Sequence, residues 1–331
     1  MKKILLATTA LCAFAGAAAA EVTVQGTAEM GVTSTEYSDN SKTQFHNSYN
    51  INFKMSGETD TGLAFGASYR LDADANSEEN QNPVGDNGTA WISGAFGKLT
   101  LGDTDGALDW ALTETAMGTT ITDEGTIGVG YSGNSDGYYD DQVLRYEYSF
   151  GDFGFAASLE QDDGNSTSGE GDEMIGLGVK YATSMGGVDL GFGLGYQTGQ
   201  TTRDELGNGA PIIFDADYDG EYTDLDVIGL SASASVDAGF SAVLNYVDYS
   251  FGDAEDMQHY GVGLGYEVGA LLLHANWGKW ETDNNDSFDS YAVLVNYDLG
   301  GGAILAAGWT NDVSFDDGEQ DQWSVGMSMS F

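Results

Sequence analysis

The chain has 331 residues, with 53 acidic against 10 basic side chains, a formal net charge of −43 and 41% hydrophobic residues. The 18 Tyr, 15 Phe and 6 Trp exclude a disordered acidic tail, because such tails are poor in aromatic side chains. The same charge argues against a nucleic-acid partner, since binding to phosphates needs clustered Lys and Arg. The length allows two soluble domains or one large all-β domain.

The first segment, residues 1–20, has the form of a cleaved secretory signal peptide. Two lysines precede a short apolar run, and small residues at the A-x-A position place the cleavage site near Ala20 and Glu21. Cleavage leaves residues 21–331 as a single domain and removes the only cysteine, Cys12, so we expect no disulfide framework. No later run of eighteen apolar residues predicts a transmembrane helix.

The segments that follow alternate apolar and polar residues with a period of two, which is the signature of β-strands. The last segment is typical, because Ser or Gly separates each apolar residue from the next: Trp323, Val325, Met327, Met329 and Phe331. Each such segment has one apolar face and one face of polar residues or glycine.

The connections between these segments distinguish a soluble sandwich from a barrel. Seven short turns lie near 57–62, 97–98, 151–152, 185–187, 237–239, 269–270 and 300–302. Eight longer acidic loops lie near 35–43, 73–88, 103–141, 161–173, 199–225, 252–258, 281–289 and 312–320. Short turns on one side and long loops on the other predict an all-β fold, a sixteen-stranded antiparallel transmembrane β-barrel. The first strand, near 22–32, is expected to pair with the last and leave no free edge.

Residue placement along the strands agrees with a membrane barrel. Aromatic residues such as Phe150, Phe153 and Phe240 lie at strand ends, where a ring suits the headgroup level. Glycines at alternate positions, at 191–195 and 261–265, predict small residues that face the lumen.

No pattern predicts an enzyme. The three histidines, His46, His259 and His274, lack the spacing of metal ligands, and no nucleophile lies in a recognisable relation to a base. We therefore expect no catalytic residue.

Several segments resemble the general diffusion porins of alphaproteobacteria, the Rhodobacter-type group: 54–70, 91–103, 297–302 and the terminal Phe331. The resemblance implies a homotrimer of barrels in the outer membrane of a Gram-negative bacterium, in contact with lipid and lipopolysaccharide. It also implies passive diffusion of small hydrophilic solutes and ions, with the third external loop, 103–141, folded inward as a constriction.

The charges of this chain depart from that family. Such porins usually set an acidic inward loop against a wall of basic residues, whereas the inward positions of the second strand here read Ser48, Asn50, Asn52 and Lys54. By alternation the basic residues that line the pore are Lys54, Arg70, Arg145 and Lys180. The loop has no basic residue and carries Asp103, Asp105, Asp109, Glu114, Asp123, Glu124, Asp136, Asp140 and Asp141. We therefore predict a channel that prefers cations, because a like-charged ion meets poorly screened repulsion in a narrow passage.

Two alternatives stay open: a substrate-specific channel, and a barrel that serves as an enzyme or adhesin. No resident cofactor is expected, but the acidic outer loops favour structural Ca²⁺. The most specific pattern for a metal lies in the fifth loop, at Asp215, Asp217, Asp219 and Asp226, where carboxylates hold positions one, three, five and twelve of a calcium loop and Gly220 holds position six.

Overall fold

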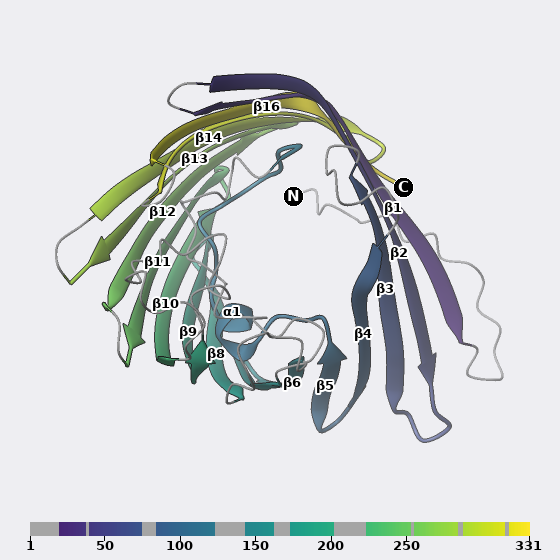
Figure 1. The fold of residues 1–331 in the computed structure, drawn as a ribbon. Coiled ribbons are helices and arrows are strands. Elements are labelled where there is room, and N and C mark those ends of the chain that lie inside the picture. Colours follow the sequence, from purple (N-terminus) through teal and green to yellow (C-terminus); the bar gives the residue numbers. More distant parts are fainter. Residues whose placement is uncertain are drawn as a thin grey trace.

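A computed structural model of the chain describes residues 20–37, 40–74, 84–122, 143–161, 173–201, 223–252, 255–283, 287–314 and 318–331. Nearly all of these residues form antiparallel strands that close into one barrel (Figure 1). The predicted fold class is confirmed.

Sixteen strands follow one another around the barrel in chain order. The first eight are β1 (Glu21–Tyr37), β2 (Asn40–Glu58), β3 (Ala64–Asp74), β4 (Val84–Gly94), β5 (Gly97–Gly102), β6 (Val143–Phe150), β7 (Phe153–Glu160) and β8 (Met174–Met185). The others are β9 (Val188–Thr201), β10 (Thr223–Val236), β11 (Phe240–Phe251), β12 (Met257–Val268), β13 (Leu271–Thr282), β14 (Ser287–Gly300), β15 (Ala303–Ser314) and β16 (Gly318–Ser330). One described helix, α1 (Ala107–Ala111), lies inside the ring of strands (Figure 1). No helix among the described residues is long and apolar enough to cross a membrane.

The two ends of the chain form the seam of the barrel. Strand β1 pairs with β16 through Thr27 to Tyr37, as the sequence predicted. Beyond this ladder, the amide of Phe331 donates to the carbonyl of Gly26 at 2.8 Å, and the amide of Gly26 donates back at 3.3 Å. The barrel therefore leaves no unpaired edge at which another chain could add a strand.

The alternation of side chains places the apolar face outside. On β10, Leu225 and Val227 are buried inside the barrel, whereas Ile228 and Leu230 are each 47% exposed. The same outward face carries exposed large apolar residues on other strands, among them Phe155, Leu177, Leu194, Leu244, Leu264, Val293 and Leu305. An apolar belt on the outside is the reverse of a water-soluble fold and suits the hydrocarbon of a bilayer.

Several predicted connections differ from the observed ones by a few residues, and two of them show why. The turn expected at 97–98 lies at 95–96, because Gly94 already pairs with Gly97, whose φ of +109° is easily adopted by glycine. Lys98 is therefore a strand residue. The loop expected at 35–43 is shorter, because β1 and β2 continue to Tyr37 and Asn40, and Ser34 and Thr43 hydrogen-bond across them at 2.8 Å.

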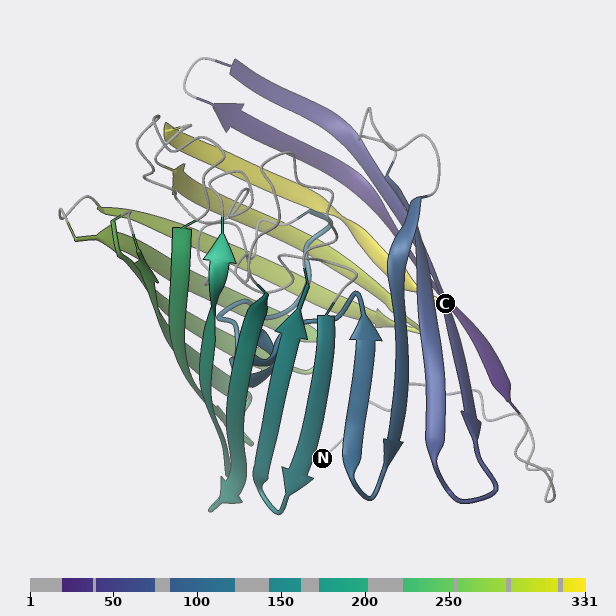
Figure 2. The same cartoon turned by 60° about the horizontal axis from the view of Figure 1, so that its bottom comes forward.

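The strands differ in length around the barrel. β1 and β2 have 17 and 19 residues, whereas β5 has 6 and β6 and β7 have 8 each. Figure 2 shows the long strands rising well above the short ones. The short sector is where the third external loop leaves β5.

Candidate functional site

The described part of the third external loop, 103–122, turns inward directly after β5. Its helix α1 packs against β7, β8 and β9, and Leu108 is fully buried there. Ala and Leu suit this short helix, because Ala loses no side-chain entropy and buries no polar group and Leu loses little rotamer freedom in a helix. This part of the loop therefore lies against the inner wall of the barrel (Figure 1).

Glycines on the wall make room for the backbone of the loop. A Cβ atom at Gly178, Gly193 or Gly263 would collide with the carbonyl oxygens of Ala107, Ala111 and Thr115, respectively. A carbonyl of the main chain cannot move aside as a flexible side chain does. The alternate glycines on β8, β9 and β12 therefore form a track along which the loop docks.

Polar side chains of the wall hold the same backbone by hydrogen bonds. The Oγ atoms of Ser158 on β7 and Ser231 on β10 accept from the amides of Ala107 and Thr113, at 2.8 and 3.0 Å. On β14, Asn296 accepts from the amide of Thr119 at 2.8 Å and donates to its carbonyl at 2.6 Å. These contacts anchor the loop at three points along the wall.

The described segment ends against the seam. Ile121 is 1% exposed, and its side chain occupies the space that a Cβ atom at Gly31 on β1 or Gly326 on β16 would need. The loop thus follows the wall from β7 to the seam and leaves the lumen face of β2–β4 uncovered by its described part.

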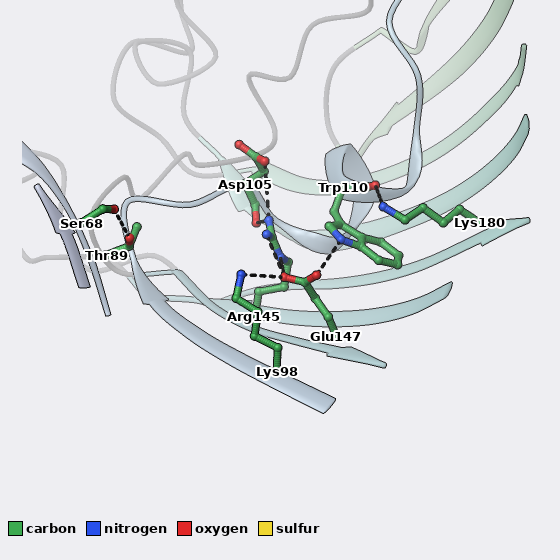
Figure 3. Close-up of polar contacts among 8 residues, drawn as sticks. All are labelled: Ser68, Thr89, Lys98, Asp105, Trp110, Arg145, Glu147 and Lys180. Atoms are coloured by element: carbon green, nitrogen blue, oxygen red, sulfur yellow. Dashed lines mark hydrogen bonds and ion pairs between the residues drawn. The ribbon is translucent and has the colours of Figure 1, made fainter. Parts of the chain in front are cut away.

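A cluster of charged side chains fixes the start of the loop (Figure 3). Arg145 on β6 donates to Glu147 at 3.1 Å and to the carbonyl of Asp105, and it lies 3.6 Å from the carboxylate of Asp105. Its side chain is only 8% exposed. Lys98 on β5 reaches Glu147 at 3.7 Å. The guanidinium therefore ties the loop to the wall and is largely withdrawn from the lumen water.

Lys180 on β8 is also engaged with the loop (Figure 3). Its ammonium group donates to the carbonyl of Trp110 at 3.3 Å and lies 3.6 Å from the centroid of the indole ring. The indole nitrogen of Trp110 donates to Glu147 at 3.1 Å. A cation over an aromatic face is stabilised by the ring quadrupole, so this contact adds to the anchor.

Arg70 and Lys54 lie on the uncovered wall. The register puts Arg70 opposite Asn52 and Lys54 opposite Ser68, on the face that also carries the hydrogen-bonded pair Ser68 and Thr89 (Figure 3). The side chain of Arg70 is 50% exposed and pairs with Asp72 at 2.7 Å. Within the described part of the chain, Lys54 takes part in no ion pair.

The acidic residues of the loop repel one another. Burial raises the pKa of Glu114, and the nearby charges of Asp109 and Asp105 raise it further, although its side chain reaches the lumen. Burial also raises the pKa of Asp103, with Arg70 acting in the opposite direction and the carboxylates of Asp105 and Asp72 adding to the rise. The segment 103–122 contains no basic residue to offset these charges.

Several residues predicted to form sites lie outside the described residues. These are Asp123, Glu124, Asp136, Asp140 and Asp141 of the third loop, and Asp215, Asp217 and Asp219 of the calcium pattern. Asp226 is described: it lies in β10 on the outer face, where the hydroxyl of Tyr196 donates to it at 2.6 Å. The described ranges contain no group of three or more His, Cys, Asp or Glu arranged to hold a metal ion.

Sequence reasoning missed several residues of this site. Lys98 was discoverable, because it alternates with the outward Leu99 and Leu101. Ser158, Ser231 and Asn296 carry no local signal, since each resembles any other polar residue on a strand. Their role depends on which segment of the loop passes beside them.

Comparison with known proteins gives consistent results for this arrangement. The sequence matches the family described as Gram-negative porin over residues 7–331. A porin of Rhodobacter capsulatus is 30% identical over 300 residues, which cover 87% of this chain and 93% of the relative.

Two solved structures share the fold. A porin refined at 1.8 Å resolution has 25% identity and a TM-score of 0.64, and the match covers 94% of this chain and all of that one. A triple mutant of the Rhodopseudomonas blastica porin has 20% identity and a TM-score of 0.67, and the match covers 94% of this chain and all of that one. At 20% identity this similarity is evidence for the shared fold only.

Proposed function

This chain belongs to the Gram-negative porin family, a family of outer-membrane channels without enzymatic activity, and from that premise we propose that its channel prefers cations and is narrowed by the third external loop. The observation that carries the proposal is the acidic segment 103–122, which is anchored along the inner wall by Ser158, Ser231 and Asn296. Fixed loop carboxylates would place negative charge at one depth of the lumen.

The balance of charge in the lumen favours cations. Two of the four predicted wall bases, Arg145 and Lys180, are bound to the loop or to Glu147, so little of their charge acts on a passing ion. Arg70 is paired with Asp72. The third loop, 103–141, carries nine acidic residues and no basic one. Walls of low dielectric strengthen the field of these carboxylates, so anions meet a barrier and cations are concentrated.

The zero-current potential across a salt gradient tests this proposal. Purified protein in a planar bilayer should give the sign of a cation-selective pore. The preference should weaken as salt rises, because the Debye length falls from about 10 Å at 0.1 M to about 3 Å at 1 M. An anion-selective sign would refute the preference without affecting the assignment to the family.

We also propose that export ends with cleavage near Ala20 and Glu21. The first strand begins at Glu21, directly after the predicted signal peptide, which supports a mature domain of 21–331. Intact mass of the protein extracted from outer membranes measures the cleavage point.

The assembly is proposed to be a homotrimer in contact with lipid and lipopolysaccharide. Resemblance to the Rhodobacter-type porins and the apolar outer belt support this assembly. Native mass spectrometry in mild detergent should show three copies, and a single copy under all gentle conditions would contradict it.

Calcium is proposed to bind at the fifth external loop through Asp215, Asp217, Asp219 and Asp226. The spacing supports this site, whereas the hydrogen bond from Tyr196 to Asp226 competes for one ligand. Calorimetric titration with Ca²⁺ of the protein and of an Asp217→Asn, Asp219→Asn variant tests this site. Equal calcium stoichiometry and affinity in the two proteins would refute it.

A further inference from the structure

One carboxylate on the described inner wall is shared by several basic side chains (Figure 3). Glu147 accepts from Nε and Nη2 of Arg145 at 3.2 and 3.1 Å, and the ammonium of Lys98 lies 3.7 Å from the same carboxylate oxygen. The indole nitrogen of Trp110 donates to the other oxygen at 3.1 Å, and the ammonium of Lys180 lies over that indole ring. Glu147 is therefore the acidic centre of a basic cluster.

The strand positions place this cluster on the side of the loop that faces the short turns. Lys98 is the second residue of β5, directly after its turn, and pairs with Glu147 on β6. Arg145, two residues closer to the loop on β6, reaches Asp105 at the start of the loop. An ion that has passed the loop therefore meets the cluster on its way towards the short turns.

The cluster is open to the water of the lumen on one side. The side chains of Lys98 and Glu147 are 40% and 21% exposed, and Lys180 is exposed as well. Its three bases are opposed by the carboxylates of Glu147 and Asp105, which leaves an excess of one positive charge. Without the charge of Glu147 this excess would double.

We infer that Glu147 is a specificity-determining residue of the channel. Its carboxylate neutralises bases that would otherwise repel cations next to the loop, because a fixed charge in a narrow passage with walls of low dielectric is poorly screened. The inference rests on the proposed cation preference and assigns part of that preference to a residue of the wall. Glu147 thus differs from Ser158, Ser231 and Asn296, which hold the loop without contributing a charge.

Two variants separate the charge of Glu147 from its contacts. Glu147→Gln keeps the length of the side chain and removes the charge, whereas Glu147→Asp keeps the charge on a shorter side chain. The zero-current potential across a potassium chloride gradient in a planar bilayer is measured at low salt, where the Debye length is about 10 Å. Glu147→Gln should lower the permeability ratio of cation to anion about twofold, the effect of removing one charge about a Debye length from the ion. Glu147→Asp should keep a ratio close to that of the wild type.

A compensating variant distinguishes an electrostatic role from a structural one. Lys98→Met should raise the cation preference, and its combination with Glu147→Gln should return the ratio to the wild-type value, although it restores no contact. The matched control is Asp248→Asn on β11, whose carboxylate accepts from the outward Tyr246 at 3.1 Å. This control removes the same charge from the outer face of the barrel and should leave the ratio unchanged.

Equal potentials in the wild type and in Glu147→Gln overturn the inference. An equal shift in Glu147→Gln and Glu147→Asp also overturns it, because the contacts of the side chain would then be responsible. If Glu147→Gln does not fold, Lys98→Met tests the same cluster from its exposed side, and an unchanged potential there is decisive against the inference. An anion-selective wild type refutes the proposed cation preference separately, because Glu147→Gln should then move the potential still further towards anions.

Discussion

The two walls of the lumen use the same alternating sequence pattern for opposite purposes. On β6–β14 the inward positions that hold the loop are Arg145, the alternate glycines, Ser158, Ser231 and Asn296. On β2–β4 the inward positions include Asn50, Asn52, Lys54 and Arg70, whose side chains project into the lumen. An inward position can therefore either hold the loop or carry a polar side chain on the opposite wall. Apart from those at Glu147, substitutions on the first wall should change stability and loop position, and those on the second should change ion preference.

Replacing Arg145 by Met should give the largest loss of stability. The substitution removes the buried guanidinium from Glu147 and from the carbonyl of Asp105, and breaking such a buried charge pair costs about 3 kcal/mol. Urea unfolding after refolding into detergent measures this loss. Arg70→Met is the matched control, because Arg70 is half-exposed and its pair is worth about 1 kcal/mol or less. Equal losses of unfolding free energy in the two variants would contradict the idea that the two walls have different roles.

Gly178→Val should displace the loop. Valine favours strands, so the change would stabilise the strand if no loop were present, but here its Cβ meets the carbonyl of Ala107. Overpacking of this kind costs about 1–3 kcal/mol. We expect larger or unsteady single-channel currents. Gly26→Ala is the control, since its added Cβ makes only ordinary contacts at 3.7 Å or more.

Asn296→Ala should loosen the end of the loop without unfolding the barrel. It removes two hydrogen bonds to Thr119, together worth about 2 kcal/mol. The expected signature is greater open-channel noise at unchanged barrel stability. Asn245→Ala is the matched control, because Asn245 is a buried asparagine on β11 that makes no hydrogen bond within the described structure. Quiet currents in both variants would show that the glycine track alone holds the loop.

Arg70→Ala should sharpen the ion preference. Removing the half-exposed base on the open wall leaves Asp72 and Asp103 less compensated, so selectivity should move further towards cations while the fold persists. The reversal potential measures the shift. No change in Arg70→Ala or in Lys54→Ala would mean that the open wall does not act on passing ions.

Acidification should produce the smallest effect, and its sign follows from the raised pKa values of Glu114 and Asp103. A raised pKa means that these groups take up protons at a higher pH than ordinary carboxyls. Cation preference should therefore begin to fall while other carboxylates remain charged. Their protonation relieves an unfavourable charge, so over the range between the folded and the unfolded pKa it adds stability. Glu114→Gln should remove part of the early fall in the reversal potential.

The fold was predictable from the sequence, whereas the attachment of the loop was only partly so. Period-two alternation and the difference between turns and loops are local signals, and they predict strands, closure and lumen phase. Lys98 was missed because the turn was expected at 97–98, two residues later than it lies. Asn296 was out of reach, because its partner Thr119 is 177 residues away and no local pattern brings the two together. The docking role of Gly178 was likewise not predictable, because a glycine at an inward strand position indicates only that a small residue faces the lumen.

The seam between β1 and β16 has a consequence for how the barrel forms. Every other pairing joins strands that are neighbours in the chain, so hairpins can form early with short loop closures. The seam joins Gly26 to Phe331, across almost the whole described chain, and its entropy cost is recovered only when the full ladder pairs. Closure is therefore expected to be the last and slowest event of folding. Until then the two end strands present open edges, and the hydrogen bonds between Phe331 and Gly26 form only when the seam closes.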